Sequence, residues 1–142
     1  MTLPDRVYTV TGWYDGPREG IADYRGAPHS YASQFTNISS DSEDVFVLRP
    51  VDKQTLALAL EDWEIWLRWE AAFHAGRTTA ETHPALPADR LRHDEIAPQL
   101  QARLEARGGA PQHAHGRFQQ ETAGAPLTVQ WTLAEAPPPT AS

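Results

Sequence analysis

Cysteine is absent from the 142-residue sequence, so disulfide bonds, thiol catalysis and cysteine-ligated zinc sites are excluded. No apolar run approaches the roughly 18 residues that a membrane-spanning helix needs. The first residues also lack the basic start and apolar stretch of a secretory signal peptide. We therefore expect a cytoplasmic protein that has no membrane partner.

Basic residues are also scarce. Lys53 is the only lysine, and the formal net charge is −7. Nucleic-acid-binding proteins neutralise phosphates with clustered Lys and Arg side chains, and no such cluster stands out along the chain. We therefore expect no nucleic-acid partner. A protein partner is possible, because an acidic surface can steer a basic protein towards it.

Sequence motifs of the common enzyme classes are missing as well. There is no Walker loop, GxGxxG fingerprint, HExxH motif, EF-hand loop or nucleophile elbow. What the chain does contain is a substantial apolar fraction of 40%, including five tryptophans. A disordered chain would not carry such a content of aromatic residues, so we expect a folded protein.

Short β-branched and aromatic segments predict strands near both ends of the chain. The predicted strands cover residues 6–13, 21–24, 28–35, 45–48, 117–122 and 127–134. The last segment alternates apolar and polar residues, as a half-buried strand does. We expect the stretch around His113 and His115 to be flexible and to offer no more than an adventitious metal contact. Residues 136–142 are proline-rich, which predicts a disordered tail.

Two helices are predicted between these groups of strands. Asp52 is a suitable N-cap for a helix from residue 53 to about residue 75, and Gly76 lies where a C-cap glycine is expected. A second helix is predicted from about residue 88 to residue 107, and Pro98 should kink or split it.

The order of strands, two helices and further strands indicates the α+β class, because the two kinds of element are segregated along the chain. We expect an antiparallel sheet of about five to six strands with a long central helix and a second, proline-interrupted helix. All of these elements are assigned to a single domain that covers residues 5–135.

The first predicted helix has a broad apolar arc. On a helical wheel, Leu56, Leu60, Trp66 and Leu67 lie near Trp63, and the width of the arc predicts a helix that is covered on two sides. Two interpretations of its tryptophans stay open. They form a stacking platform for a ligand or, as is more usual for such a stripe, part of the core.

Two polar residues, Glu70 and His74, lie within the same arc, and their i,i+4 spacing lets their side chains meet. One interpretation is a buried, hydrogen-bonded pair that needs no cofactor. The other is half of a metal or acid–base site, which His83 and His93 would complete from the following segment. Mixed Glu and His ligands suit zinc or iron.

A turn near the N-terminus supplies a second group of candidates for binding a ligand or a partner. These candidates are Tyr14, Arg18, Asp23, His29 and Tyr31. The planar guanidinium of Arg18 could hold a carboxylate or a phosphate. Alternatively, Asp15 and Gly16 form a tight turn in which Arg18 pairs with a nearby acid.

Several short motifs carry a resemblance that covers most of residues 7 to 100. These motifs are Asp15-Gly16-Pro17-Arg18, Gly20-Ile21-Ala22-Asp23-Tyr24, Pro28-His29, Glu61-Asp62-Trp63, Ile65-Trp66, Arg68-Trp69-Glu70 and Thr82-His83-Pro84-Ala85-Leu86-Pro87. Together they are similar to a group of small bacterial proteins that have no assigned function. The resemblance implies a bacterial protein, and it implies no activity, cofactor or catalytic residue.

Two functional hypotheses follow. The first is a non-enzymatic binding or regulatory protein that acts through an acidic surface. The second is a metal-dependent enzyme with a site built on Glu70, His74, His83 and His93. The first is favoured, because the sequence contains no demonstrable catalytic constellation.

Overall fold

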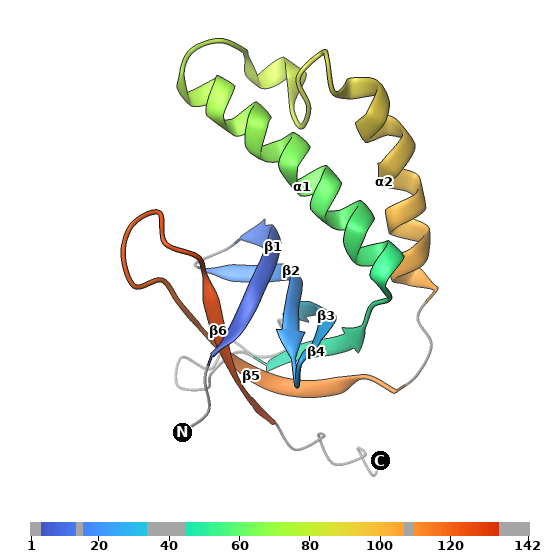
Figure 1. The fold of residues 1–142 in the computed structure, drawn as a ribbon, viewed down its shortest axis with the longest axis vertical. Coiled ribbons are helices and arrows are strands. Elements are labelled where there is room, and N and C mark those ends of the chain that lie inside the picture. The colour runs from blue at the N-terminus through green and yellow to red at the C-terminus, as the bar shows by residue number, and fades with distance from the viewer. Residues whose placement is uncertain (1–3, 14–15, 34–44, 107–109, 134–142) are drawn as a thin grey trace, which may run out of the picture. The chain divides into compact units, whose positions relative to one another are not determined.

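The structure is a computed structural model that describes residues 4–13, 16–33, 45–106 and 110–133 (Figure 1). The chain divides into two compact units. One unit comprises residues 1–51 and 108–142 and contains the strands, and the other comprises residues 52–107 and contains the helices. The proline-rich segment 136–142 lies outside the described residues.

The first unit is built from six strands. They are β1 (Asp5–Trp13), β2 (Pro17–Tyr24), β3 (Ala27–Ser33), β4 (Val45–Pro50), β5 (Gln112–Gln119) and β6 (Thr128–Leu133). Each strand pairs antiparallel with the next, and β1 also pairs with β6. The six strands therefore form a closed barrel.

The expected fold class, an open α+β sheet with a long central helix, is wrong. Barrel closure depends on the pairing of Asp5 with Val129 and of Arg6 with Thr128, which joins the two ends of the described chain. No local pattern in the sequence indicates such a distant pairing. The centre of the barrel is filled by side chains from the strands, so no helix is needed to cover an open sheet face.

Aromatic side chains fill much of the barrel interior. Tyr31 and Phe46 are buried, and Phe118 and Trp131 pack against the same cluster. The Phe46 and Trp131 rings meet edge to face, with centroids 5.6 Å apart, which is a favourable geometry for aromatic pairs. Gly116 makes room for this packing, since a Cβ atom there would lie 2.6 Å from the Trp131 ring.

The second unit is a helical hairpin formed by α1 (Lys53–His74), a short 3-10 helix η1 (Ala80–Thr82) and α2 (Arg90–Glu105). The predicted cap of α1 is confirmed, because the Asp52 carboxylate accepts a hydrogen bond from the Thr55 backbone N–H at 2.7 Å. Pro98 lies inside α2 without dividing it. Among the described residues, no helix is both long and apolar enough to cross a membrane.

The stretch around His113 and His115, expected to be flexible, is instead a regular part of β5. Its residues pair with β4 on one side and with β6 on the other. The expected strand began only at residue 117, because Gln112 to Gly116 contains no β-branched side chain that would signal a strand.

Candidate functional site

The side of α1 that faces α2 carries the apolar core of the hairpin. Ile65 of α1 and Ile96 of α2 are only 1% and 0% exposed, and Ala85 from the connecting segment packs with them. Leu58 and Leu100 extend this cluster along the two helices. Ile65 therefore marks the side of α1 that is used to hold the hairpin together.

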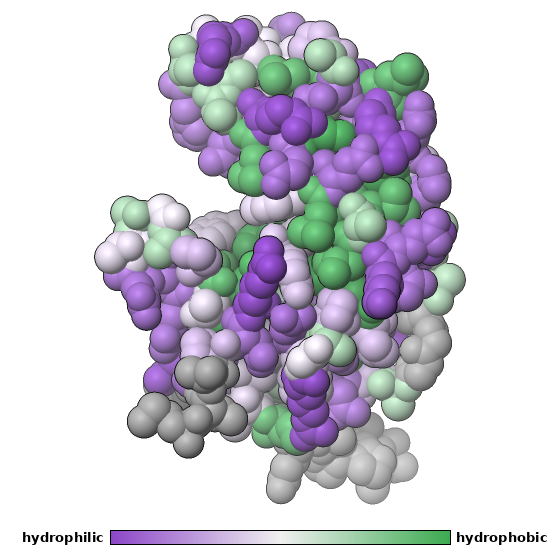
Figure 2. Space-filling view, viewed as in Figure 1, coloured by the Kyte–Doolittle hydropathy of each residue, from purple (hydrophilic) through white to green (hydrophobic). Residues whose placement is uncertain are grey.

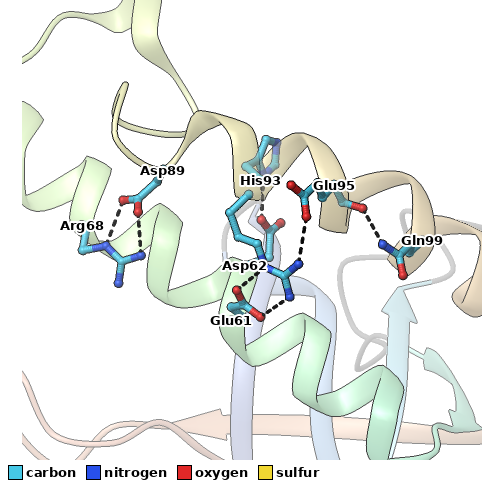
Figure 3. A network of polar contacts seen from close by, with 8 residues as sticks. Glu61, Asp62, Arg68, Asp89, His93, Glu95 and Gln99 are labelled. Carbon is cyan, nitrogen blue, oxygen red and sulfur yellow. Dashed lines mark hydrogen bonds and ion pairs between the residues drawn. The ribbon is translucent and has the colours of Figure 1, made fainter.

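Ion pairs flank this core and fasten α1 to α2 (Figure 3). The Arg68 guanidinium donates two hydrogen bonds to Asp89, at 2.9 and 3.0 Å, and Arg92 donates to both oxygens of Glu61. Each guanidinium stabilises the charged form of its partner and thereby lowers the pKa of Asp89 and of Glu61. These acids are thus engaged within the hairpin.

Two of the histidines proposed as metal ligands take part in the same packing. His93 contacts the Asp62 carboxylate, with 2.6 Å between Nδ1 and Oδ1 (Figure 3). The ring of His83 meets the Trp69 ring edge to face at 4.7 Å. Trp69 in turn donates from Nε1 to the Thr82 hydroxyl at 2.9 Å. Both imidazoles therefore lie against partners other than Glu70 and His74.

The proposed metal ligands do not come together. No group of three or more His, Cys, Asp or Glu side chains suited to a metal ion is found within the residues that the structure describes. Glu70 is half-buried and His74 is exposed. No hydrogen bond joins these two side chains in the described region, and the His74 ring lies beside Phe73 instead.

The opposite side of α1 carries a second apolar surface. At about 100° per residue, Trp63 and Leu67 project about 160° away from Ile65. We define the aromatic face of α1 as Leu56, Leu60, Trp63, Trp66 and Leu67. Leu67 is 37% exposed and the other four are partly exposed. On the visible face of the hairpin in Figure 2, hydrophobic residues (green) likewise interrupt the hydrophilic surface (purple).

The two tryptophans of the aromatic face stack on each other. The centroids of the Trp63 and Trp66 rings are 5.0 Å apart and the ring planes differ by 21°. Each indole therefore holds its neighbour in place while part of its own surface stays accessible to water. Large apolar side chains that remain accessible on an ordered helix are typical of binding surfaces.

Acidic side chains border the aromatic face. Glu64 is exposed and Glu70 is half-buried, and neither forms an ion pair at contact distance within the described part of the chain. Residues 52–106 carry ten acidic side chains against six Lys and Arg side chains. The acids are Asp52, Glu61, Asp62, Glu64, Glu70, Glu81, Asp89, Asp94, Glu95 and Glu105. The hairpin is thus an acidic element.

The candidates from the N-terminal turn lie along β2 and β3, and Tyr14 lies outside the described residues. Tyr31 is 0% exposed and donates from its hydroxyl to the Thr9 carbonyl at 2.9 Å, so it belongs to the barrel core. Asp23 accepts a hydrogen bond from the Tyr8 hydroxyl at 3.1 Å. Arg18 is half-buried in β2.

His29, the remaining candidate from this turn, lies near the start of β3. Its Nδ1 is 2.8 Å from the Ala27 carbonyl oxygen, and its ring meets Tyr24 edge to face at 5.2 Å. The ring is therefore held by its own hairpin.

Comparison with known proteins gives no further guidance on this site. No protein-family model, curated protein or solved structure significantly matches the chain.

Proposed function

We propose that this protein is a non-enzymatic protein-binding module, in which the aromatic face of α1 binds a basic amphipathic segment of a partner. The observation that carries the proposal is the stacked pair of Trp63 and Trp66, both partly exposed, with Trp63 on the side of α1 that faces away from Ile65. Stacking fixes the two indoles before any partner arrives, so binding costs little side-chain entropy.

The apolar part of the proposal follows from the residue types on this face. Tryptophan is enriched among the few interface residues that carry most of the binding free energy, because its large ring buries much apolar surface. Leu56, Leu60 and Leu67 lie beside the indoles at helical spacing. The resulting stripe matches the apolar side of an amphipathic helix, which is a common form of protein recognition.

The basic character of the partner follows from the charges around the stripe. Glu64 and Glu70 border the aromatic face, and the hairpin as a whole carries an excess of acidic side chains. Lys or Arg residues of a partner would pair with these carboxylates. They could also lie over the indole rings, where cations are attracted to the π-electrons.

A metal-dependent enzyme is the weaker candidate, since no group of three or more His, Cys, Asp or Glu side chains suited to a metal ion is found among the described residues. We also propose a cytoplasmic location, which is supported by the absence of cysteine in a chain of this size.

The proposal can be tested with a synthetic amphipathic helical peptide that presents Lys on one face and Leu on the other. Its binding to the full chain is measured by fluorescence anisotropy of a dye on the peptide. Replacement of both Trp63 and Trp66 by alanine should weaken binding at least about tenfold, since truncated hot-spot residues typically cost about 2 kcal/mol or more. Replacement of Glu64 and Glu70 by glutamine should weaken it less.

Two controls separate this site from general stickiness. Trp13 of β1 is 68% exposed, so Trp13→Ala removes an accessible indole from the other unit and should leave the affinity unchanged. A peptide with Glu in place of Lys should gain nothing from the two indoles, so its affinity should be the same for the wild type and for the Trp63→Ala, Trp66→Ala variant. An unchanged affinity of this variant for the Lys peptide, or an equal loss of affinity for both peptides, would contradict the proposal.

A further inference from the structure

The outer face of the barrel differs in charge from the hairpin. In β4 and β5, Phe46 pairs with Ala114 and both are buried, so these residues point into the barrel. Successive residues of a strand point to opposite faces. His113 and His115, on either side of Ala114, therefore lie on the outer face of β5.

Arginines continue this outer face on the neighbouring strands. Arg49 follows the buried Leu48 in β4, and Arg117 pairs with Gln130 of β6 on the same side as His115. Arg6 of β1 pairs with Thr128 of β6. The basic strip is defined by these residues: Arg6, Arg49, His113, His115 and Arg117. Arg6 and Arg117 are exposed.

Of the strands that carry this strip, β4 and β5 contain no acidic residue, whereas β1 contains Asp5. In the described part of the barrel unit, the acids are Asp5, Glu19, Asp23 and Glu121, which lie on β1, on β2 and in the turn between β5 and β6. Asp5 precedes Arg6 and so points to the opposite face of β1. The strip thus combines three guanidinium groups with two imidazoles on adjoining strands of a chain whose net charge is −7.

The residue types on the strip favour carboxylates as its ligand. The guanidinium fork matches the geometry of a carboxylate, and Thr132 adds an exposed hydroxyl that can bind a peptide backbone. Sheets that bind single-stranded nucleic acid present aromatic rings on which bases stack. The aromatic residues of β4, β5 and β6 are Phe46, Phe118 and Trp131, and all three belong to the barrel core.

From these observations we infer that the basic strip binds an acidic segment of a polypeptide. This second surface is independent of the aromatic face of α1, and it selects a ligand of the opposite charge. A chain with both surfaces can hold a basic and an acidic protein segment at the same time.

A labelled poly-glutamate peptide tests the inference with the full chain, and a labelled oligothymidylate is the comparison. The peptide should bind, and its affinity should fall as salt is added, because salt screens exposed charges. Replacement of Arg6 and Arg117 by glutamine should weaken binding about tenfold or more, since hydrogen bonds to charged groups are among the stronger ones. Arg117→Lys keeps the charge but loses the planar fork, so it should weaken binding, though less than Arg117→Gln does.

The matched control is Arg25→Gln, which removes an exposed arginine from the turn between β2 and β3 and should leave binding unchanged. Thermal melting shows whether each variant is folded. If the variant with both arginines replaced does not fold, Arg6→Gln alone should still weaken the binding of poly-glutamate. The inference is overturned if poly-glutamate does not bind, if the Arg25 variant loses as much affinity, or if oligothymidylate binds more tightly. The Trp63→Ala, Trp66→Ala variant should keep its affinity for poly-glutamate, so the two proposals fail separately.

Discussion

Removal of the Tyr31 hydroxyl tests whether this residue holds the barrel together. Tyr31 is 0% exposed and Thr9 is 2% exposed, and the hydroxyl donates to the Thr9 carbonyl oxygen at 2.9 Å. Tyr31→Phe keeps the ring but leaves this carbonyl without its donor in a place that water does not reach. A buried group that loses its partner typically costs about 1–3 kcal/mol, and we expect a loss of stability in this range.

Urea unfolding followed by circular dichroism measures the effect, with the slope of the transition checked for constancy. Tyr8→Phe is the control. Its hydroxyl donates to Asp23 at 3.1 Å from a partly exposed position, so the loss should stay under about 1 kcal/mol. A loss below about 0.3 kcal/mol for Tyr31→Phe would refute a structural role of its hydroxyl, because even an average hydrogen bond contributes more.

The effect of Tyr31→Phe on the free energy of unfolding should also depend on pH in the alkaline range. Burial raises the pKa of Tyr31 above its ordinary value of 10.0. A folded-state pKa above the unfolded value means that the contribution of this group to stability is complete below pH 10.0 and is lost as the pH rises beyond it. The phenylalanine variant lacks this loss. The difference in stability between wild type and variant should therefore shrink above pH 10.0.

Three further predictions concern charged groups. Arg68 lowers the pKa of Asp89, so the stability that this ion pair contributes is present above pH 3.8 and is lost on acidification below it. Asp89→Asn should therefore lower the free energy of unfolding by less than about 1 kcal/mol at neutral pH and leave it unchanged in strong acid. Thermal melts at both pH values measure the difference. Burial raises the pKa of Asp5, so Asp5→Asn should stabilise the barrel slightly at neutral pH and not below pH 3.8, and a fall in melting temperature at neutral pH would contradict this. Glu70→Gln and His74→Ala should be additive within about 0.3 kcal/mol in a double-mutant cycle, because no hydrogen bond links the two within the described residues.

The local elements could be predicted from the sequence, whereas the way they close could not. The start of α1 at residue 53 follows from Asp52, whose carboxylate caps the first turn in the structure. The end of α1 could be predicted from Gly76, because glycine readily adopts a positive φ, and its φ in the structure is 74°. Closure of the barrel by Asp5 and Val129 is different, because it depends on the shape of the whole sheet and leaves no periodic trace in either strand.

The site shows the same division between local and distant information. The sequence shows the wide apolar arc of α1 around Trp63, but it does not show which part of the arc packs inside. The structure instead puts the core of the hairpin around Ile65, with Leu58 seven residues before it. The seven-residue spacing of Leu58 and Ile65 places both on one side of the helix, and this second apolar stripe is the sequence signal for the hairpin core. Which of two stripes packs inside cannot be decided before the position of α2 is known.

The metal hypothesis assumed that His83 and His93 would converge on α1 near Glu70. Both histidines do return to α1, but His93 meets Asp62 and His83 meets Trp69. Sequence spacing constrains neighbours on one helix, and it says nothing about the register between two helices. The basic strip was missed for a related reason, since its arginines and histidines are distant in sequence and gather only across paired strands.

The most direct test of the proposed function uses the indole N–H groups as reporters. The chain has five tryptophans, and each gives one indole signal in a ¹H–¹⁵N NMR spectrum. Titration with the Lys-Leu amphipathic peptide should shift the signals of Trp63 and Trp66, while those of Trp13 and Trp131, which lie in the barrel unit, stay in place. Shifts confined to Trp13 or Trp131, or no shift at a peptide concentration that saturates binding, would contradict the assignment of the aromatic face of α1 as the partner site.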